Sequence, residues 1–341
     1  MKRKAYIYPV TNRIRTGIYN PYLDNFMSST FQQISYLNSK YPSNTGILNL
    51  FRFLHRIDLL MLNWIEDLPD KKGGIFQTIL FLILLKVIKL THIKIVWTLH
   101  NKFSHSSDYL ALKKRLFFQL LKSSDLIITH SAEGIRFAES LVPGISTRFF
   151  YFPHPVVPVK HEDEIEELKK YDILIWGTLA PYKAVDLFLE QLYEKKLETR
   201  FRILIAGKSV SDDFFNKIRK YENASITIKN QFIKNEELTV MIKQSKVVLF
   251  TYAGDSVLSS GALIDSVANG ALVVGPDVGA FNEMGNEGII KTYDNYEELF
   301  TILERIDQYY TLEAKEKIEK FIFSHQWKDF SKEFEKRLNN I

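Results

Sequence analysis

The stretch FTYAGDSVLSSGALIDSVANGALVVG, residues 250–275, carries the pattern that decides the fold. It predicts a buried strand over residues 246–251, a polar loop, a short helix that begins at Ser259-Ser260-Gly261, and a second strand over residues 271–274. The same alternation of strands and helices runs through the whole chain. Such alternation favours an α/β fold with parallel sheets that are covered by helices on both faces.

The start of this helix is a candidate anion site. A loop of small hydroxyl residues that leads into a helix presents unpaired backbone N–H groups and the positive end of the helix dipole, which bind phosphate. Gly261 has no side chain to keep a phosphate away, and Asp265 lies one turn further on, where a carboxylate can accept hydrogen bonds from ribose hydroxyls. The alternative is a capped helix without a ligand.

The chain divides near residue 155. Pro153, Pro155 and Pro158 and the acidic run over residues 161–167 mark a break, after which the alternation restarts. We therefore expect two doubly wound, Rossmann-like domains that face each other across a cleft, with ligand sites beyond the carboxyl ends of the strands. Before the break we expect strands over residues 5–10, 58–64, 93–99, 125–129 and 148–152, and helices over 22–39, 47–55, 75–90 and 110–121. After it we expect strands over residues 172–176, 201–206, 225–228, 246–251 and 271–274.

Composition bounds the class of protein. With 341 residues, 46% hydrophobic and 25% charged, the chain reads as a soluble globular protein with two cores. The absence of cysteine excludes disulfides and thiolate metal sites and fits a reducing compartment. The basic N-terminus is not expected to be a signal peptide, because its apolar run is too short. We expect no metal site, because no cluster has metal-ligand spacing.

The two halves differ in charge. Residues 1–150 contain 20 Lys and Arg against 9 Asp and Glu, whereas residues 151–341 contain 25 against 31. The first half is therefore expected to meet a polyanion, either nucleic acid or an anionic membrane. Residues 75–95 are very apolar but carry three lysines, which fits a core helix or a helix at the bilayer interface. The basic residues 113–115 precede an apolar run, and without a nucleic-acid-binding motif we favour an anionic membrane and no nucleic acid.

The second half resembles the donor-binding domain of GT-B glycosyltransferases, especially the retaining family 4 and related bacterial capsule and exopolysaccharide enzymes. The resemblance rests on order and spacing, and it spans nearly the whole chain. The segments that carry it are residues 173–179 (ILIWGTL), 181–186 (PYKAVD), 203–207 (ILIAG), 231–238 (QFIKNEEL) and 259–270 (SSGALIDSVANG). In the first half the weaker matches are Trp97 to Asn101 and Tyr19 to Tyr22, and the tail around Trp327 resembles the helix that crosses back to the first domain.

The resemblance implies domains at residues 1–153, for the acceptor, and 154–324, for the nucleotide-sugar donor, with a C-terminal helix at about 325–341 that packs on the first. Two departures stand out. Retaining family-4 enzymes usually carry two glutamates eight positions apart, whereas here the pair is Val257 and Asp265, and the arginine common after the first glycine turn is Thr178. A different sugar, an inverting reaction or a loss of activity would each fit these departures.

The resemblance also implies residue roles in the donor site. Lys183 would neutralise the donor diphosphate, Ser259, Ser260 and Gly261 would hold it, and Gly177 would allow close backbone approach. The alternatives are a solvated lysine, a plain helix cap and a tight turn. The full set of expected donor-binding residues is Thr16, Gly17, Gly177, Lys183, Gly207, Lys208, Phe232, Ile233, Tyr252, Ser256, Ser259, Ser260, Gly261 and Asp265.

The catalytic candidates lie in the first half. His100 ends a strand and would point into the cleft, unless it is a histidine satisfied inside the fold. An inverting enzyme needs a carboxylate base, for which Glu66, Asp67 and Asp108 are the candidates. The expected acceptor-binding residues are Asn20, Tyr22, Asn101 and His105.

The sequence therefore predicts a glycosyltransferase with no cofactor and with a nucleotide diphosphate sugar, of UDP or GDP type, as its donor. The expected acceptor is a membrane-associated, lipid-linked saccharide in surface polysaccharide synthesis. The expected place is the cytoplasm, peripheral at the inner face of the cell membrane. Two alternatives remain, namely a non-catalytic partner subunit that binds sugar nucleotides or glycans, and a nucleotide-sugar epimerase of the same fold.

Overall fold

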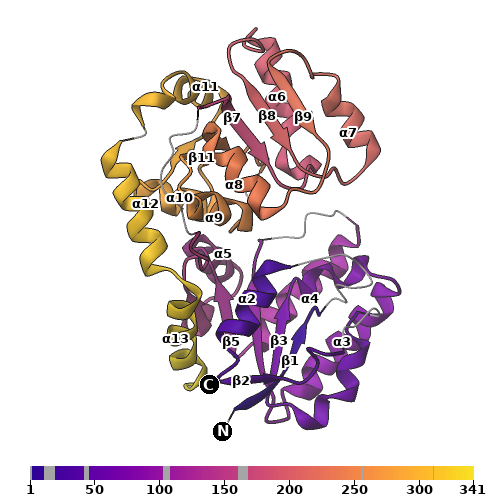
Figure 1. Cartoon of the computed structure of the whole chain (residues 1–341). Coiled ribbons are helices and arrows are strands. Elements are labelled where there is room, and N and C mark those ends of the chain that lie inside the picture. The colour runs from indigo at the N-terminus through magenta and orange to yellow at the C-terminus, as the bar shows by residue number, and fades with distance from the viewer. Residues whose placement is uncertain are drawn as a thin grey trace. The chain divides into compact units, whose positions relative to one another are not determined.

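The computed structural model describes residues 2–10, 20–41, 46–102, 108–159, 168–254, 256–309 and 311–341. The chain divides into two compact units (Figure 1). Unit 1 comprises Met1–Pro153 and Trp327–Ile341, and unit 2 comprises His154–Gln326. Three of the expected site residues, Thr16, Gly17 and His105, lie outside the described residues.

Unit 1 is built on a parallel six-stranded sheet in the order β2-β1-β3-β4-β5-β6. Its strands are β1 (Arg3–Tyr8), β2 (Ile34–Tyr36), β3 (Leu59–Asn63), β4 (Lys94–Leu99), β5 (Leu126–Thr129) and β6 (Phe149–Tyr151). Its α-helices are α2 (Pro21–Ser29), α3 (Gly74–Ile88), α4 (Leu110–Ser123), α5 (Ala132–Leu141) and α13 (Trp327–Leu338). Short 3-10 helices are η1 (Leu48–Arg52), η2 (Leu54–Arg56), η3 (Ile65–Asp70) and η4 (Ile145–Arg148). All of β3 is buried, as expected of a parallel strand covered on both faces.

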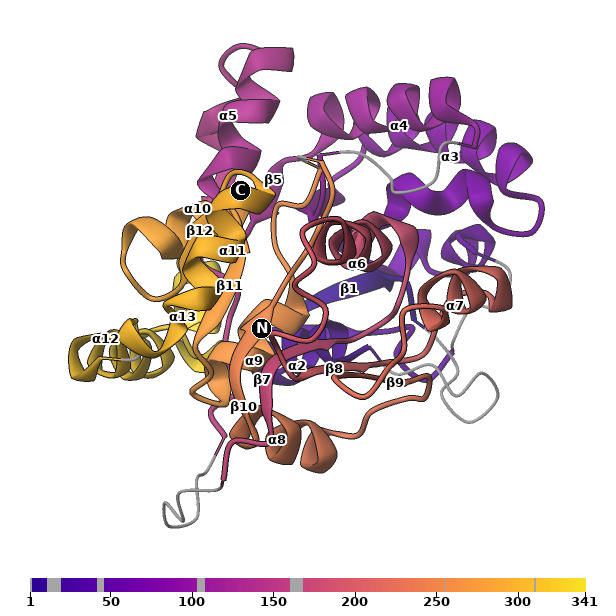
Figure 2. The ribbon, with the colours of Figure 1, turned by 90° about the horizontal axis from the view of Figure 1, so that it is seen from above.

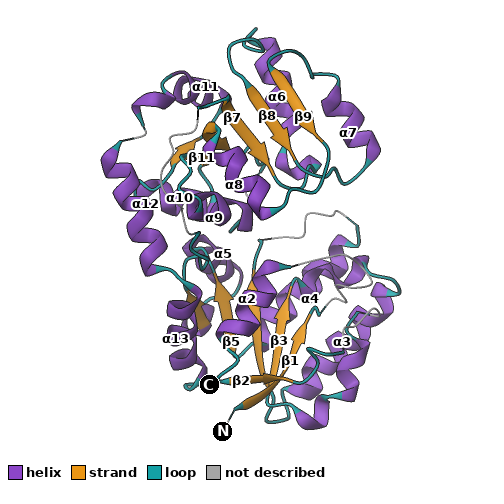
Figure 3. Ribbon diagram, viewed as in Figure 1, coloured by secondary structure: helices purple, strands orange, loops and turns teal. Residues whose placement is uncertain are grey.

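Unit 2 has a second parallel six-stranded sheet, in the order β12-β11-β10-β7-β8-β9. Figure 3 shows strands β7, β8 and β9 of this sheet with helices α6, α7 and α8 around them. Its strands are β7 (Tyr171–Trp176), β8 (Ile203–Ala206), β9 (Ile226–Lys229), β10 (Ser245–Leu249), β11 (Val273–Pro276) and β12 (Lys291–Tyr293). Its α-helices are α6 (Val185–Glu194), α7 (Asp212–Arg219), α8 (Asn235–Lys243), α9 (Gly261–Ala268), α10 (Gly279–Asn286), α11 (Tyr296–Glu304) and α12 (Leu312–Ser324), and its 3-10 helices are η5 (Pro181–Lys183) and η6 (Ile306–Gln308). The two doubly wound sheets confirm the expected α/β fold class.

The core of unit 2 follows from the alternation of side chains along its strands. On β7, Ile173 and Ile175 belong to one hydrophobic cluster and Leu174 belongs to another. Because successive side chains of a strand point to opposite faces, the two clusters cover the two faces of the sheet. Helices are packed on both clusters, so the functional groups of this unit are left to the loops at the ends of the strands.

The C-terminal helix α13 belongs to unit 1. Phe330 and Phe334 pack against Phe26 of α2, with ring centroids 5.5 and 5.6 Å apart, and Trp327 contacts Tyr22 at 5.3 Å. These aromatic contacts hold the last turns of the chain on the first sheet. They also explain why Trp327 stands at the start of this otherwise charged helix.

Two expected helices of unit 1 are wrong. The helix expected over residues 22–39 ends at Ser29, with Thr30 as its C-cap, because Ile34–Tyr36 instead joins the sheet as a strand beside β1. The helix expected over residues 47–55 consists of two 3-10 turns instead. Among the described residues, no helix is long and apolar enough to cross a membrane.

Candidate functional site

The strand order of unit 2 reverses between β7 and β10, which lie side by side. In open α/β sheets, ligands bind beyond the carboxyl ends of the strands at such a reversal. The chain leaves β7 through Gly177 and leaves β10 through Thr251 and Tyr252. These two exits therefore define where a ligand site is expected in this unit.

Gly177 occupies a backbone conformation that favours glycine, with φ at +101°. A Cβ atom placed on it would lie 2.7 Å from Lys183 Nζ, so the lysine amine rests directly over this turn. The same Cβ would lie 4.0 Å from the Ala262 side chain in the first turn of α9. Gly207, expected in the donor site, packs against the turn itself, because a Cβ there would lie 1.7 Å from the Gly177 carbonyl oxygen.

Lys183 is a buried cation at this reversal. Its side chain is only 9% exposed, and burial lowers the pKa of its amine to about 8. The Thr251 hydroxyl donates to the Lys183 carbonyl at 2.5 Å, which fixes η5 to the end of β10. The ammonium lies 5.7 Å from the centre of the Tyr252 ring, and within the described part of the chain no carboxylate lies within ion-pair distance of it. The side chain is thus buried rather than solvated.

Helix α9 begins beside this lysine. Ser260 is its N-cap, where the side-chain oxygen accepts from Leu263 N at 3.3 Å and pairs with the Tyr252 hydroxyl at 3.0 Å. Gly261 faces open space, because a Cβ on it would have no atom within 4 Å. The neighbouring Ser259 hydroxyl oxygen is buried and has no hydrogen-bond partner among the described residues. The helix start confirms the predicted element.

Asp265, one turn into α9, and Val257, eight positions before it, differ in exposure. Asp265 is exposed on the helix, yet the surrounding protein raises the pKa of its carboxyl to about 6 by burial. Val257, eight positions earlier, is only 4% exposed and packs in the hydrophobic core, so this position does not present a side chain to a ligand. Thr178 is exposed directly after Gly177.

The remaining expected donor residues lie around this cluster. The Lys208 carbonyl accepts a hydrogen bond from Leu179 N at 3.0 Å, which places the end of β8 beside the turn after β7. The Lys208 side chain is exposed. Phe232 is 76% exposed, Ile233 packs partly against the core, and Ser256 is half-buried. The contacts described above join Gly177, Lys183, Tyr252, Ser260 and Ala262, and Ala262 was not expected from the sequence.

The strand order of unit 1 reverses between β1 and β3, and the chain leaves β3 through η3. Glu66 in η3 is buried, and this burial, with the neighbouring Asp67 charge, raises the pKa of its carboxyl to about 8. One carboxyl oxygen of Glu66 and one of Asp67 are buried without a hydrogen-bond partner among the described residues. Burial and these two carboxylates raise the pKa of Tyr8 as well. Asp108, the third base candidate, is exposed just before α4.

His100 lies in an aromatic cluster at the carboxyl edge of the same sheet. Its ring stacks on Trp64 with centroids 4.0 Å apart, and its Nε2 lies 3.2 Å from Asn63 Oδ1. Tyr22 meets the His100 ring edge-on at 4.9 Å. The side chain is 8% exposed, so it is packed into the fold while a small part of it reaches the surface.

A second histidine, His130, completes this cluster and was missed from the sequence. The Tyr22 hydroxyl lies 2.9 Å from its Nε2, and its Nδ1 lies 2.8 Å from the Phe152 carbonyl oxygen. Its signal was its position, because His130 follows the end of β5 as His100 follows the end of β4. Tyr22 is therefore a core residue in contact with both histidines.

Two further acceptor candidates have local roles or little contact. Asn20 is the N-cap of α2, where its side chain accepts from Leu23 N at 3.4 Å, and Asn101 is half-buried. In the part of the chain that the structure describes, no group of three or more His, Asp and Glu side chains could hold a metal ion.

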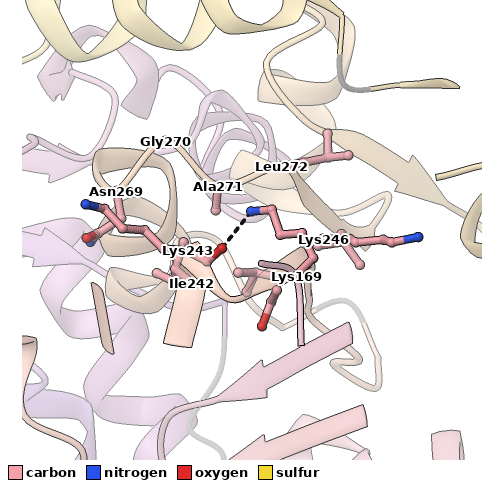
Figure 4. A pocket seen from close by; sticks show the side chains of 11 residues that line it. Lys169, Ile242, Lys243, Lys246, Asn269, Gly270, Ala271 and Leu272 are labelled. Atoms are coloured by element: carbon pink, nitrogen blue, oxygen red, sulfur yellow. Dashed lines mark hydrogen bonds between the residues drawn. The ribbon is translucent and has the colours of Figure 1, made fainter. Parts of the chain in front are cut away.

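A small pocket of unit 2 lies away from the reversal (Figure 4). It is lined by residues at the amino ends of β7, β10 and β11, including Lys169, Lys246 and Gly270. Lys169 Nζ donates to the Lys243 carbonyl at 2.8 Å, and Lys246 forms ion pairs with Asp172 and Asp307. Because this edge is opposite to the carboxyl ends, the pocket is separate from the cluster around Lys183.

Comparison with known proteins gives this geometry a context. Residues 170–307 match the family described as "Glycosyl transferases group 1". A comparison of the sequence with curated proteins finds no match. The fold is similar to that of HepE from Anabaena in complex with UDP and glucose, at 11% identity and a TM-score of 0.73, with 100% of each chain covered. It is also similar to an alpha-glucosyltransferase in complex with UDP and a 13-mer DNA, at 16% identity and a TM-score of 0.62, with 99% of each chain covered.

A third similar structure is AviGT4, a glycosyltransferase involved in avilamycin A biosynthesis, at 12% identity and a TM-score of 0.57, with 98% of this chain and 96% of that one covered. These structures are similar to the chain in fold. The family match covers the sheet of unit 2 and the helices around Lys183, including α9. Residues 170–307 therefore form a domain of the kind described as glycosyl transferases group 1, and the chain has the fold of GT-B glycosyltransferases.

Proposed function

We propose that this glycosyltransferase moves a sugar from a nucleotide diphosphate sugar to a lipid-linked saccharide at the inner face of the cell membrane, in surface polysaccharide synthesis. The observation that carries the donor half of the proposal is the buried Lys183 ammonium beside the start of α9. HepE has been solved in complex with UDP-glucose, which favours a UDP-type donor over a GDP-type donor here.

The donor site follows from charge. In the transfer, an acceptor oxygen forms a bond to the anomeric carbon, the bond from that carbon to the diphosphate oxygen breaks, and the diphosphate leaves with one more negative charge. Lys183 and the N–H groups at the start of α9 stabilise this charge, with the Ser259 hydroxyl as a further donor. A buried cation without a carboxylate is costly in an empty protein, and a diphosphate supplies the missing anion.

Asp265 and the turn at Gly177 complete the donor site that we propose. The carboxylate accepts hydrogen bonds from the ribose hydroxyls, and the bare backbone at Gly177 and Gly261 lets the diphosphate approach closely. Val257 offers no carboxylate to the donor sugar, so recognition of that sugar falls to other residues.

Unit 1 supplies the groups for the acceptor in this proposal. An attacking hydroxyl must lose a proton, and Glu66, Asp67 and Asp108 are the residues that we propose for an inverting reaction. Their surroundings differ, because Glu66 is buried and Asp108 is exposed. His100, with one edge at the surface, is proposed to contact the donor sugar or the acceptor hydroxyl.

The donor assignment is tested by calorimetry with UDP and GDP on the full chain. Lys183→Met should weaken binding of the cognate nucleotide by about 10- to 100-fold, the cost of one charge-assisted contact. Lys220→Met, which removes an exposed lysine of the same unit, is the matched control and should bind normally. Unchanged affinity in the Lys183 variant would remove this residue from the donor site.

A further inference from the structure

Helix α3 is apolar on both its buried and its exposed face. Its buried face includes Phe81, Leu84, Leu85 and Ile88. The opposite face is also built of large apolar side chains, each 45–65% exposed. Leu90, two residues after the end of the helix, continues this face and is 88% exposed. The exposed large apolar residues of the helix are Ile75, Phe76, Ile79, Ile83 and Val87, and Lys86 is exposed among them. A helix that is apolar all round is normally enclosed by protein or lipid.

The exposed side chains form a continuous row. Phe76, Ile79, Ile83, Val87 and Leu90 are spaced three or four residues apart, which places them on one face of the helix. Single exposed apolar residues are ordinary on a protein surface, but a contiguous row of this kind marks an interaction site. We call these five residues the α3 row.

Helix α4 lies beside α3 (Figure 2). Leu110 and Phe118 are 45% and 38% exposed, and Lys114 and Arg115 are exposed between them. Apolar and basic side chains therefore alternate along the outer face of α4. The described part of unit 1 thus presents two adjacent helices with the same combination of groups.

The charge around the α3 row is strongly positive. Residues 71–124 contain ten Lys and Arg and one acidic residue, Asp108. The acids just outside this range are already engaged, because Asp70 pairs with Lys113 at 2.7 Å and Asp125 lies 3.7 Å from Lys89. The other exposed basic residues around the row are Lys71, Lys72, Lys86, Lys114, Arg115 and Lys122.

We propose that the α3 row, together with the exposed face of α4, docks on an anionic lipid bilayer. The apolar side chains enter the boundary between headgroups and acyl chains, and the lysines and arginine contact the anionic headgroups. Unit 1 would then be the membrane-binding part of the protein. This inference rests on the proposed lipid-linked acceptor and does not depend on the donor site.

Two other occupants fit this surface less well. A second copy of the chain would bring the same basic residues face to face, since a twofold interface joins identical patches, and like charges would oppose it. Nucleic acid would satisfy the basic residues but leave the row of apolar side chains without a matching surface.

Co-sedimentation with vesicles tests the proposal on the full chain. The wild-type protein should bind vesicles that contain phosphatidylglycerol, bind less at high salt, and bind phosphatidylcholine vesicles weakly. Ile79→Ser with Ile83→Ser should weaken binding by about tenfold or more, because both side chains would lose their burial in lipid. The matched control is Leu312→Ser with Phe323→Ser, which removes two side chains of unit 2 that are 74% and 75% exposed, and it should bind like wild type.

A fluorescent label reports contact directly. Because the chain has no cysteine, Ile83→Cys carries the only thiol, and an environment-sensitive dye attached there should shift to shorter wavelength with anionic vesicles. The same dye on Phe323→Cys should not shift. Nucleotide binding by the serine variant should stay normal, so a failure of docking is distinguished from a failure of the donor site.

Three results would overturn the proposal. The first is equal recovery of wild type with neutral and anionic vesicles, and the second is full binding by the Ile79 and Ile83 double variant. The third is a dimer in sedimentation equilibrium that the same double variant dissociates, because a second copy would then be the occupant of the row.

Discussion

The two sheets reverse their strand order in the same way but bury different ionisable groups at the reversal, an amine in unit 2 and a carboxyl in unit 1. In unit 2 the loops after β7 and β10 bury Lys183, and burial lowers the pKa of its amine to about 8. In unit 1 the loop after β3 buries Glu66, and burial raises the pKa of its carboxyl to about 8. Within the described residues neither group forms an ion pair. The comparison teaches that one topology serves two chemistries, since a buried cation suits an anionic donor and a buried carboxyl suits a hydroxyl group.

The aromatic cluster of unit 1 gives the sharpest test of this division of roles. His100→Phe keeps the stack on Trp64 and the edge contact with Tyr22 but removes both ring nitrogens. We expect transfer to fall by about 100-fold or more, with nucleotide affinity and melting temperature close to wild type. Initial rates, calorimetry and thermal melting measure the three quantities.

The control for this experiment is His92→Phe, which changes an exposed histidine of the same unit and should leave transfer unchanged. Wild-type rates in the His100 variant would show that the ring only fills space in the aromatic cluster. A large drop in melting temperature with a matching loss of active protein would point to the same conclusion.

Lys183→Met should stabilise the empty protein while it weakens nucleotide binding. The lysine amine has its pKa lowered from 10.5 to about 8 on folding, so at pH 7 the charged form is destabilised by about 3 kcal/mol. This cost is fully present below pH 8 and disappears as the pH rises through the unfolded value of 10.5. Methionine has a similar shape and no charge, so its advantage in urea denaturation should be largest near neutral pH and vanish at high pH. A variant that is less stable at pH 7 would contradict the unpaired, buried state of this amine.

Glu66→Gln is the mirror test in unit 1. Folding raises the pKa of the Glu66 carboxyl from 4.5 to about 8. The stability of the wild-type protein that depends on this proton is therefore fully present below about pH 4.5 and is lost as the pH rises through 8. The free energy of unfolding of the glutamine variant should therefore rise relative to that of wild type, by about 4 kcal/mol between pH 5 and pH 9, when urea denaturation is repeated across this range. Parallel curves for wild type and Glu66→Gln across this pH range would refute the raised pKa of Glu66.

What the sequence predicted well was local. The start of α9 at Ser260 and the approximate positions of ten of the strands along the chain depend on short patterns of capping and hydrophobic alternation, and both are confirmed. The short strand β2 was missed because its three residues continue an apolar pattern that also fits a helix, and only pairing with β1 decides between them.

The burial of the site residues, and with it their charge state, could not be predicted from the sequence. That Lys183 and Glu66 are buried, and that Val257 faces the core, depends on contacts between segments far apart in the chain. His130 joins the cluster only because β5 lies beside β4, so that the residues after the two strands come together. Sequence spacing identified the residues at the strand ends, and packing decides which of them meet.

The smallest expected effect is a fractional uptake of protons when the nucleotide binds. At pH 8 about half of the Lys183 side chains are neutral in the empty protein, because the amine pKa is about 8. A diphosphate beside the amine favours its charged form and raises that pKa, so binding should take up a fraction of one proton at pH 8 and less at pH 6. The measured binding enthalpy should therefore depend on the ionisation enthalpy of the buffer at pH 8, and Lys183→Met should remove this dependence. Net proton release at pH 8 by the wild-type protein would mean that Lys183 does not face the diphosphate. The buried amine of unit 2 would then not be explained by an anionic ligand.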